Sequence, residues 1–237
     1  MFYYFDPTLI IVLPAIIFAF WAQYRVQSTF SKYSTVVGRR GYTGFSAARR
    51  LLDANGLHGV AILQVEGKLT DHYNPRTKTL YLSREVYGSS SASAVGVACH
   101  EVGHAIQDAK AYAPLKLRLS LVPVCNVGSG LAMPLFFIGL LFSSMAQGGA
   151  EIGYWLMMTG IGFFSLATLF QLVTLPVEFN ASRRAIEGMR DYGILAAEEI
   201  DASKRVLSAA ALTYVAALAT SLLSLLRLLV IANNRRR

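Results

Sequence analysis

The chain has 237 residues, of which 54% are hydrophobic and only 15% charged, and its mean hydropathy is +0.44. A soluble domain usually carries about 25% charged residues, so this composition excludes a disordered chain and argues against an ordinary soluble enzyme. The net charge of +8 is typical either of nucleic-acid binding or of basic loops that orient a membrane protein. Because the apolar residues are clustered, we favour the membrane protein.

Four stretches are apolar enough to cross a membrane: residues 8–22, 121–145, 152–175 and 209–232. The last three approach the roughly 20 residues that a spanning helix needs. The first is shorter, but aromatic residues at its ends fit interfacial belts (Tyr3, Tyr4, Phe5, Trp21 and Tyr24). It has no basic residue before it and no small-residue cleavage signal, which indicates an uncleaved anchor.

These stretches divide the chain into five expected parts. Residues 1–23 form an N-terminal anchor, residues 24–119 a soluble segment, residues 120–176 a transmembrane hairpin, residues 177–208 a soluble helix, and residues 209–237 a membrane helix with a basic tail. Lys and Arg are frequent in residues 24–119 and absent from the link inside the hairpin, so the positive-inside rule places both soluble parts in the cytoplasm. The tail NNRRR opposes this rule, and the last stretch either spans or ends early in the interface.

The soluble segment predicts a small α+β unit. We expect a helix over residues 43–54, with Thr43 as its N-cap and Gly56 as its stop, and a buried strand over residues 60–65. A turn follows at residues 74–77, then a strand over residues 79–83 and a helix over residues 92–109 that serines cap.

The two cysteines, Cys99 and Cys125, have neither CxxC spacing nor the pattern of a disulfide scaffold. We therefore interpret both as small buried hydrophobic residues.

The expected helix over residues 92–109 carries an HExxH motif, which consists of His100, Glu101 and His104. Residues at positions i and i+4 share one helix face, so both imidazoles can reach one metal ion, and zinc suits these ligands. Glu101 is placed to take a proton from a zinc-activated water. The alternative is a chance match, which is rare in a chain with four histidines. Gly103 allows close approach of a neighbouring helix or strand.

A catalytic zinc site of this kind needs a third protein ligand. The candidates are His58, His72, Asp108, Glu151, Glu178, Glu187, Asp191, Glu198, Glu199 and Asp201. We favour Glu178, which follows the third apolar stretch where the chain returns to the cytoplasmic side. Pro176 fits the first turn of a helix there, and the alternative role of Glu178 is a carboxylate that the helix dipole stabilises.

Three segments carry a resemblance to a known family: residues 72–80 (HYNPRTKTL), 100–107 (HEVGHAIQ) and 171–184 (QLVTLPVEFNASRR). On these motifs the sequence resembles the YugP-like family of bacterial membrane zinc metallopeptidases, over nearly the whole chain. The resemblance implies one zinc ion, proteolysis and a multi-pass protein of the bacterial plasma membrane. It also implies a distant similarity to HtpX-type and prenyl-protein-type proteases, whose E-x-x-x-D motif supplies a glutamate ligand. That motif maps onto Glu178, while its aspartate position is Ser182.

An edge strand before the metal helix pairs with extended substrate in zincin-like folds, so residues 79–83 form either that edge strand or a core strand of a small sheet. An oxyanion donor is also needed besides zinc. The candidates are His72, Tyr73, Tyr81, Arg183 and Arg184, and Arg183 is favoured because it lies five residues beyond Glu178.

The sequence therefore predicts a mainly α, polytopic membrane protein with about four transmembrane helices and a small zincin-like α+β catalytic part. The expected function is a gluzincin-like zinc endopeptidase that acts on protein or peptide substrates in or near the bilayer. The alternative is a non-catalytic zinc scaffold or sensor, which has no need of Glu101. Nucleic-acid binding ranks last, because the basic residues follow the loops rather than forming one patch. The oligomeric state does not follow from the sequence.

Overall fold

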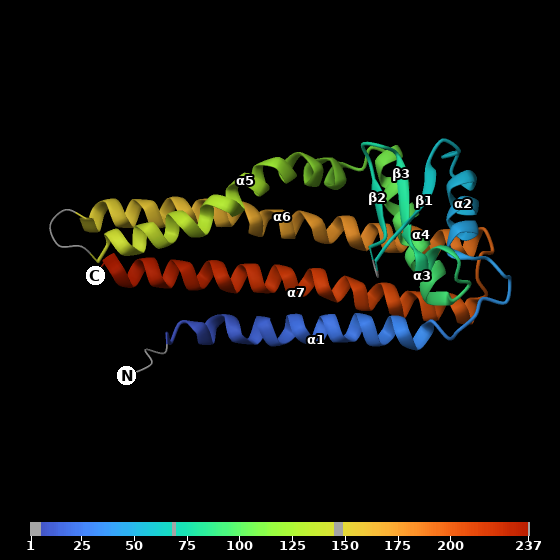
Figure 1. The fold of residues 1–237 in the computed structure, drawn as a ribbon, viewed down its shortest axis with the longest axis horizontal. Coiled ribbons are helices and arrows are strands. Elements are labelled where there is room, and N and C mark those ends of the chain that lie inside the picture. Colours follow the sequence, from blue (N-terminus) through green and yellow to red (C-terminus); the bar gives the residue numbers. More distant parts are fainter. Residues whose placement is uncertain (1–5, 68–69, 145–148, 237) are drawn as a thin grey trace. The chain divides into compact units, whose positions relative to one another are not determined.

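The computed structural model describes residues 6–67, 70–144 and 149–236 (Figure 1), so the expected interfacial residues Tyr3, Tyr4 and Phe5 lie outside it. The chain is mainly helical with one small sheet. Its elements are α1 (Leu9–Tyr33), α2 (Gly44–Ala54), β1 (Ala61–Val65), β2 (His72–Asn74), β3 (Thr79–Ser83), α3 (Arg84–Tyr87), α4 (Ala92–Ala109), α5 (Ala113–Phe142), α6 (Gly149–Asp191) and α7 (Ala197–Arg236).

Four helices are long and apolar enough to cross a membrane: α1, α5, α6 and α7. Each contains all or most of one of the four apolar stretches of the sequence. Large apolar side chains along them remain exposed, among them Ile10 (68%), Phe20 (74%) and Trp155 (63%). Such exposure suits contact with lipid chains and would be costly in water. The prediction of a mainly α membrane protein with about four spanning helices is confirmed.

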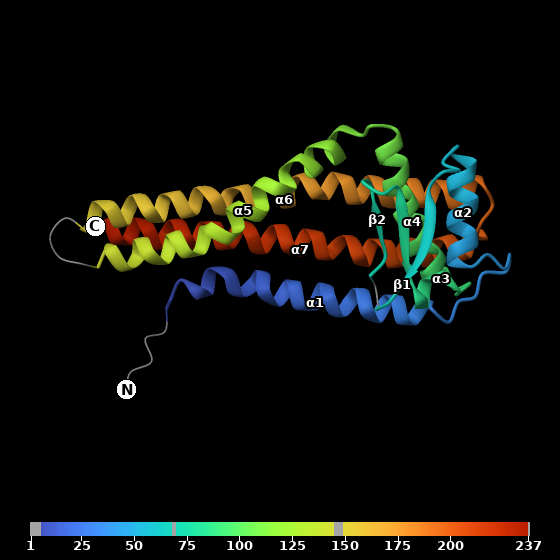
Figure 2. The same cartoon turned by 45° about the horizontal axis from the view of Figure 1, so that its top comes forward.

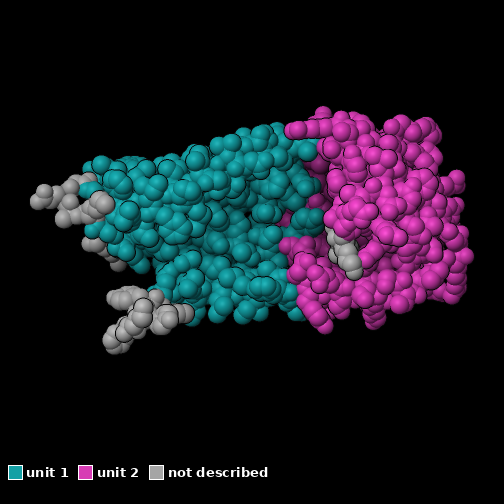
Figure 3. Space-filling model, viewed as in Figure 1, with its two compact units in different colours: residues 1–21, 117–174, 214–237 teal, residues 22–116, 175–213 magenta. Residues whose placement is uncertain are grey.

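Two compact units divide the chain, and Figure 3 colours them separately. Unit 1 comprises residues 1–21, 117–174 and 214–237, and unit 2 comprises residues 22–116 and 175–213. Unit 2 contains the sheet, α2, α3 and α4, so the HExxH motif lies in this unit.

The sheet has three strands in the order β1-β3-β2, with β1 parallel and β2 antiparallel to β3. Of the two alternatives for residues 79–83, the edge strand is wrong and the core strand is confirmed, because β3 is paired on both sides. The expectation of a buried strand at residues 60–65 is also wrong in part: the strand exists as β1, but it is an edge strand with largely exposed side chains. The buried strand is β3, whose Leu80 and Leu82 are fully enclosed. Short β2 has no apolar alternation by which the sequence could reveal it.

The core of unit 2 forms where α2 packs against α4. Leu51 and Leu52 of α2 and Val95 and Val102 of α4 are almost completely buried there. Local signals determine both helices. Thr43 caps α2 through a hydrogen bond from the Ser46 backbone nitrogen, and Ser91 caps α4 in the same way at Ala94, so the expected helices are confirmed. Cys99 and Cys125 are free and buried, as expected.

Helix α6 is one continuous helix (Figures 1 and 2). It has 43 residues and contains Pro176 in its interior. The interpretation of Pro176 as the first turn of a new helix is wrong. Proline removes one backbone hydrogen bond from a helix interior, but long apolar helices in membranes tolerate it. Glu178 is therefore presented by the last third of α6 rather than by a helix N-terminus, and the helix-dipole alternative does not apply.

Candidate metal centre

Two imidazoles and one carboxylate converge in unit 2. His100 and His104 lie one turn apart on α4, with ring centroids separated by 4.8 Å. The Oε2 atom of Glu178 lies 3.3 Å from Nε2 of His100 and 3.5 Å from Nε2 of His104. The ligand atoms of the three residues lie within 4.8 Å of one another, and among the described residues only this group has such a geometry. Two nitrogens and one carboxylate oxygen form the donor set that catalytic zinc prefers.

The close approach of α4 and α6 depends on Gly103. A Cβ atom at this position would lie 2.5 Å from the backbone oxygen of Ala181, a distance that real structures do not show. Gly103 therefore permits close packing between two helices, not the approach of a strand. Its position between the two histidines brings α6 near enough for Glu178 to face both imidazoles.

The Nδ1 atoms of both histidines have hydrogen-bond partners. Nδ1 of His104 lies 3.0 Å from Oε1 of Gln107, and Nε2 of Gln107 donates to the Val177 carbonyl (2.7 Å) and to Oδ1 of Asn180 (3.0 Å). Because only the amide nitrogen of Gln107 can donate to a carbonyl, its oxygen must face His104. The His104 Nδ1 atom then carries a proton, and Nε2 keeps the lone pair that a metal requires.

His100 has an equivalent partner on α6. Its Nδ1 atom lies 3.1 Å from Oγ of Ser182, the residue at the aspartate position of the E-x-x-x-D motif. A hydroxyl accepts one hydrogen bond from an imidazole N–H, so it can orient the ring without adding a negative charge. The residues present therefore fit a zinc ion in their ligand atoms, since Gln107 favours the required tautomer of His104 and Ser182 permits it for His100.

Sequence reasoning missed Gln107 and Asn180. Both are buried, and Asn180 also accepts a hydrogen bond of 2.7 Å from Nε of Arg184. One local signal was present, because Gln107 lies three residues beyond His104 and therefore on the same helix face. The contact with Asn180 spans 73 residues of sequence and has no local signal.

Glu101 is buried in the same region, with 9% of its surface exposed. Its Oε2 atom accepts a hydrogen bond of 3.1 Å from the backbone nitrogen of Tyr73 in β2. Burial raises the pKa of Glu101 above that of an ordinary glutamate, the nearby carboxylate of Glu178 adds to this effect, and positive charge on His100 and His104 opposes it. A carboxylate with a raised pKa is a better proton acceptor near neutral pH.

Other candidate ligands have different partners. Asp108 accepts hydrogen bonds from the Tyr73 hydroxyl (2.7 Å) and from Nζ of Lys78 (2.5 Å). Glu199 accepts hydrogen bonds from two backbone nitrogens, and Glu198 pairs with Arg39 on the surface.

The candidate histidines also have other partners. His58 lies 3.0 Å from Asp53, and His72 contacts the Thr70 carbonyl and stacks on Tyr81. None of the described candidates except Glu178 joins the two histidines of α4.

Arg183, the favoured oxyanion donor, is not brought to the metal-binding group. Its side chain is 68% exposed, and its Nε atom lies 3.9 Å from Oε1 of Glu187, one turn further along α6. Its role in catalysis stays a prediction that would require the side chain to turn when substrate binds. Tyr73 contributes its backbone nitrogen to Glu101 and its hydroxyl to Asp108.

Comparisons with known proteins agree with this geometry. Residues 8–233 match the model of a family described as "Putative neutral zinc metallopeptidase". The chain is also 46% identical over 226 residues to a protein of Bacillus subtilis (strain 168) named "Putative membrane protease YugP", and the match covers 95% of this chain and 96% of that protein. No solved structure matches. Since both matches include α4, α6 and nearly all of the remaining chain, this membrane protein belongs to the YugP-like family of neutral zinc metallopeptidases.

Proposed function

We propose that the protein is a zinc-dependent endopeptidase that hydrolyses peptide bonds of membrane or membrane-proximal proteins. The observation that carries this proposal is the convergence of His100, His104 and Glu178 beside the buried carboxylate of Glu101. In this proposal the first three residues hold one zinc ion and Glu101 is the general base. Zinc, when bound there, supplies a Lewis acid and lowers the pKa of a coordinated water.

The residues of the chain transfer the proton and orient the metal ligands. The hydrogen bond from Tyr73 to Oε2 of Glu101 leaves Oε1 as the atom that accepts a proton from the attacking water and later returns it to the leaving amine. Gln107 and Ser182 keep the two imidazoles in the orientation that presents their Nε2 atoms. Preorganised groups of this kind need little rearrangement during the reaction.

The substrate strand is β2 in this proposal. Because β3 is paired on both sides, an extended peptide can add to the sheet only at β1 or β2. The backbone nitrogen of Tyr73 in β2 points to Glu101, so this edge runs beside the proposed general base. A peptide bound along β2 would place its scissile carbonyl near Glu101. A peptide bound along β1 would be separated from β2 and Glu101 by β3.

A second candidate function is a non-catalytic zinc scaffold or sensor. Such a site needs the three ligands but not a buried carboxylate at Glu101. Burial of a charged group costs desolvation free energy, and zinc binding alone would not require that cost. The arrangement around Glu101 therefore favours the enzyme.

The direct test uses the purified full-length protein in detergent, its metal content and a peptide library. We expect about one zinc ion per chain, cleavage of a subset of peptides, loss of cleavage after chelation, and recovery on addition of zinc. Chelated protein that remains fully active would contradict metallopeptidase chemistry. Protein with one tightly bound zinc ion and no cleavage of peptides or of membrane-protein substrates would favour the scaffold or sensor.

We further propose that the protein spans the bacterial plasma membrane several times with unit 2 in the cytoplasm. The support is the concentration of Lys and Arg in residues 24–119 and their absence from the link before α6.

This orientation predicts the labelling of single cysteines by an impermeant thiol reagent. A cysteine at Ala150 should react in intact cells, whereas a cysteine at Thr77 should react only after permeabilisation, and both positions are exposed. Cys99 and Cys125 are buried and should contribute little background. Burial raises the pKa of Cys99 to about 12, which suppresses its thiolate. The reverse pattern of labelling would place unit 2 outside the cell and change the pool of substrates.

A further inference from the structure

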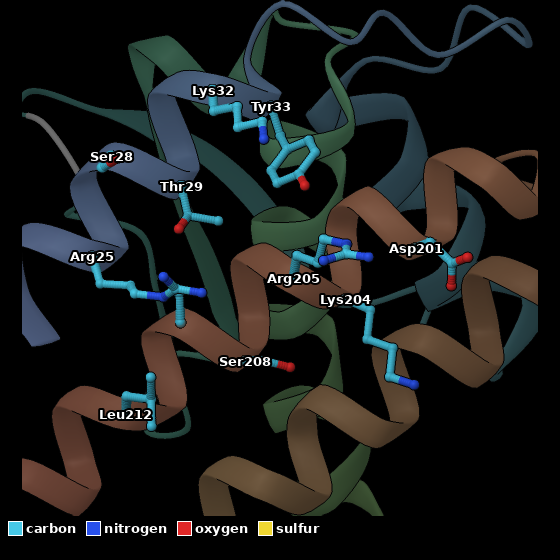
Figure 4. A pocket seen from close by; sticks show the side chains of 11 residues that line it. Arg25, Ser28, Thr29, Lys32, Tyr33, Asp201, Lys204, Arg205, Ser208 and Leu212 are labelled. Atoms are coloured by element: carbon cyan, nitrogen blue, oxygen red, sulfur yellow. The ribbon is translucent and has the colours of Figure 1, made fainter.

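A second site of a different kind lies between α1 and α7, within unit 2. It is a pocket of about 580 Å³, shown in Figure 4, and it is separate from the residues of the metal centre. Its lining combines cationic side chains with hydroxyl groups. The cationic residues are Arg25, Lys32, Lys204 and Arg205, and the hydroxyl groups belong to Ser28, Thr29, Tyr33 and Ser208.

The lining residues of this pocket carry more positive than negative charge. Asp201 supplies the one carboxylate among the lining residues, against four cations. Within the described part of the chain, Lys204 and Arg205 form no ion pair, whereas Glu198, six residues before Lys204, pairs with Arg39. Figure 4 shows Arg25 reaching from α1 and Arg205 from α7 into the same hollow. Like charges brought together repel one another unless an anion neutralises them.

The pocket also lies at the level where the apolar stretches end. Arg25 follows the end of the first stretch by three residues and Arg205 precedes the start of the fourth by four, so at 1.5 Å per residue they lie about 5 and 6 Å beyond these ends. The polar headgroup layer of a bilayer is about 5–8 Å thick on each side. The backbone positions of both arginines therefore fall within this layer.

The lining changes from polar to aliphatic in the direction of the membrane. Ala209 and Leu212, which begin the fourth apolar stretch, complete the pocket. A free phosphate ion would make no use of aliphatic lining. A phospholipid would, because its glycerol and first acyl carbons lie directly below the phosphate.

We propose that this pocket binds the phosphate of an anionic phospholipid headgroup, with Arg25 and Arg205 as its principal cationic partners. Guanidinium groups bind phosphate oxygens in a bidentate manner, and the neighbouring hydroxyl groups can donate further hydrogen bonds. Basic pockets between membrane helices favour anionic headgroups for these reasons. The bound lipid neutralises the repulsion between residues 22–33 of α1 and residues 201–212 of α7, and thereby stabilises their packing.

The test compares two double variants of the full-length protein with equal loss of charge. Arg25→Gln with Arg205→Gln removes two cations of the pocket. Lys116→Gln with Arg118→Gln removes two cations that directly precede another apolar stretch but do not line the pocket. Thermal unfolding in neutral detergent is followed while phosphatidylglycerol, phosphatidylcholine or inorganic phosphate is titrated, and native mass spectrometry counts the bound lipids.

We expect the unaltered protein to bind one phosphatidylglycerol and to be stabilised by it, but not by phosphatidylcholine. The pocket variant should bind phosphatidylglycerol roughly thirtyfold more weakly, and the control variant less than about twofold more weakly.

Equal weakening in the two variants, or equal stabilisation by phosphatidylcholine, would overturn the proposal. Stabilisation by inorganic phosphate at the same concentration as phosphatidylglycerol would identify the ligand as a soluble anion and overturn the assignment to lipid. If the double variant does not unfold cooperatively, the single variant Arg205→Gln serves the same comparison, with an expected loss of roughly fivefold.

Discussion

Replacement of Glu101 by Gln is expected to leave zinc bound while peptide hydrolysis falls by roughly 10²–10⁴-fold, the range typical of a lost general base. The amide oxygen can still accept the hydrogen bond from the Tyr73 backbone nitrogen, so β2 and α4 should keep their positions. Stability should change little, because the substitution removes a buried carboxylate whose pKa is already raised by that burial.

Zinc content and proteolysis must be measured on the same preparation, since the prediction separates the two. Glu198→Gln is a suitable control, because Glu198 is an exposed glutamate that pairs with Arg39 away from the metal centre. We expect this control to keep both zinc and activity. A fully active Glu101→Gln variant that retains zinc would show that another group is the base, and would contradict the mechanism proposed here.

Replacement of Glu178 by Ala is expected to remove zinc and activity together. Two histidines on α4 would remain, and a site with two protein ligands binds zinc far more weakly than a site with three. The loss of affinity should exceed the roughly 10–100-fold that follows removal of an outer hydrogen-bond partner of a ligand. His100→Ala and His104→Ala should behave in the same way, whereas Ser182→Ala, which removes only the partner of His100, should cost less.

The measurement is a zinc competition titration with a chromophoric chelator, which does not depend on activity. Glu187→Ala, nine residues further along α6, tests whether removal of any carboxylate from this helix has the same effect. A Glu178→Ala variant that keeps stoichiometric zinc and full activity would mean that the third ligand lies elsewhere. Asp108 would then be examined first, although its present partners are Tyr73 and Lys78.

Features that depend on neighbours in sequence could be predicted without the structure. The four apolar stretches determine four long helices, because a spanning helix satisfies its own backbone hydrogen bonds and needs only apolar side chains. The limits of α4 follow from the serine cap at its start, and the placement of His100 and His104 on one face follows from helix geometry alone. Glu178 was favoured by its position and by the resemblance to a family, and its role as a ligand stays a prediction.

Features that depend on residues far apart in sequence were decided only by the tertiary structure. The order of the strands placed β3 in the centre and β1 at an exposed edge, because pairing joins segments that no local pattern connects. Pro176 lies inside a continuous helix because tertiary packing and membrane context override a local breaker. The contact of Gln107 with Asn180 and the gathering of Arg25 and Arg205 in one pocket likewise depend on helix packing. Amino-acid sequence specifies such packing through the whole core at once, and therefore no short segment reveals it.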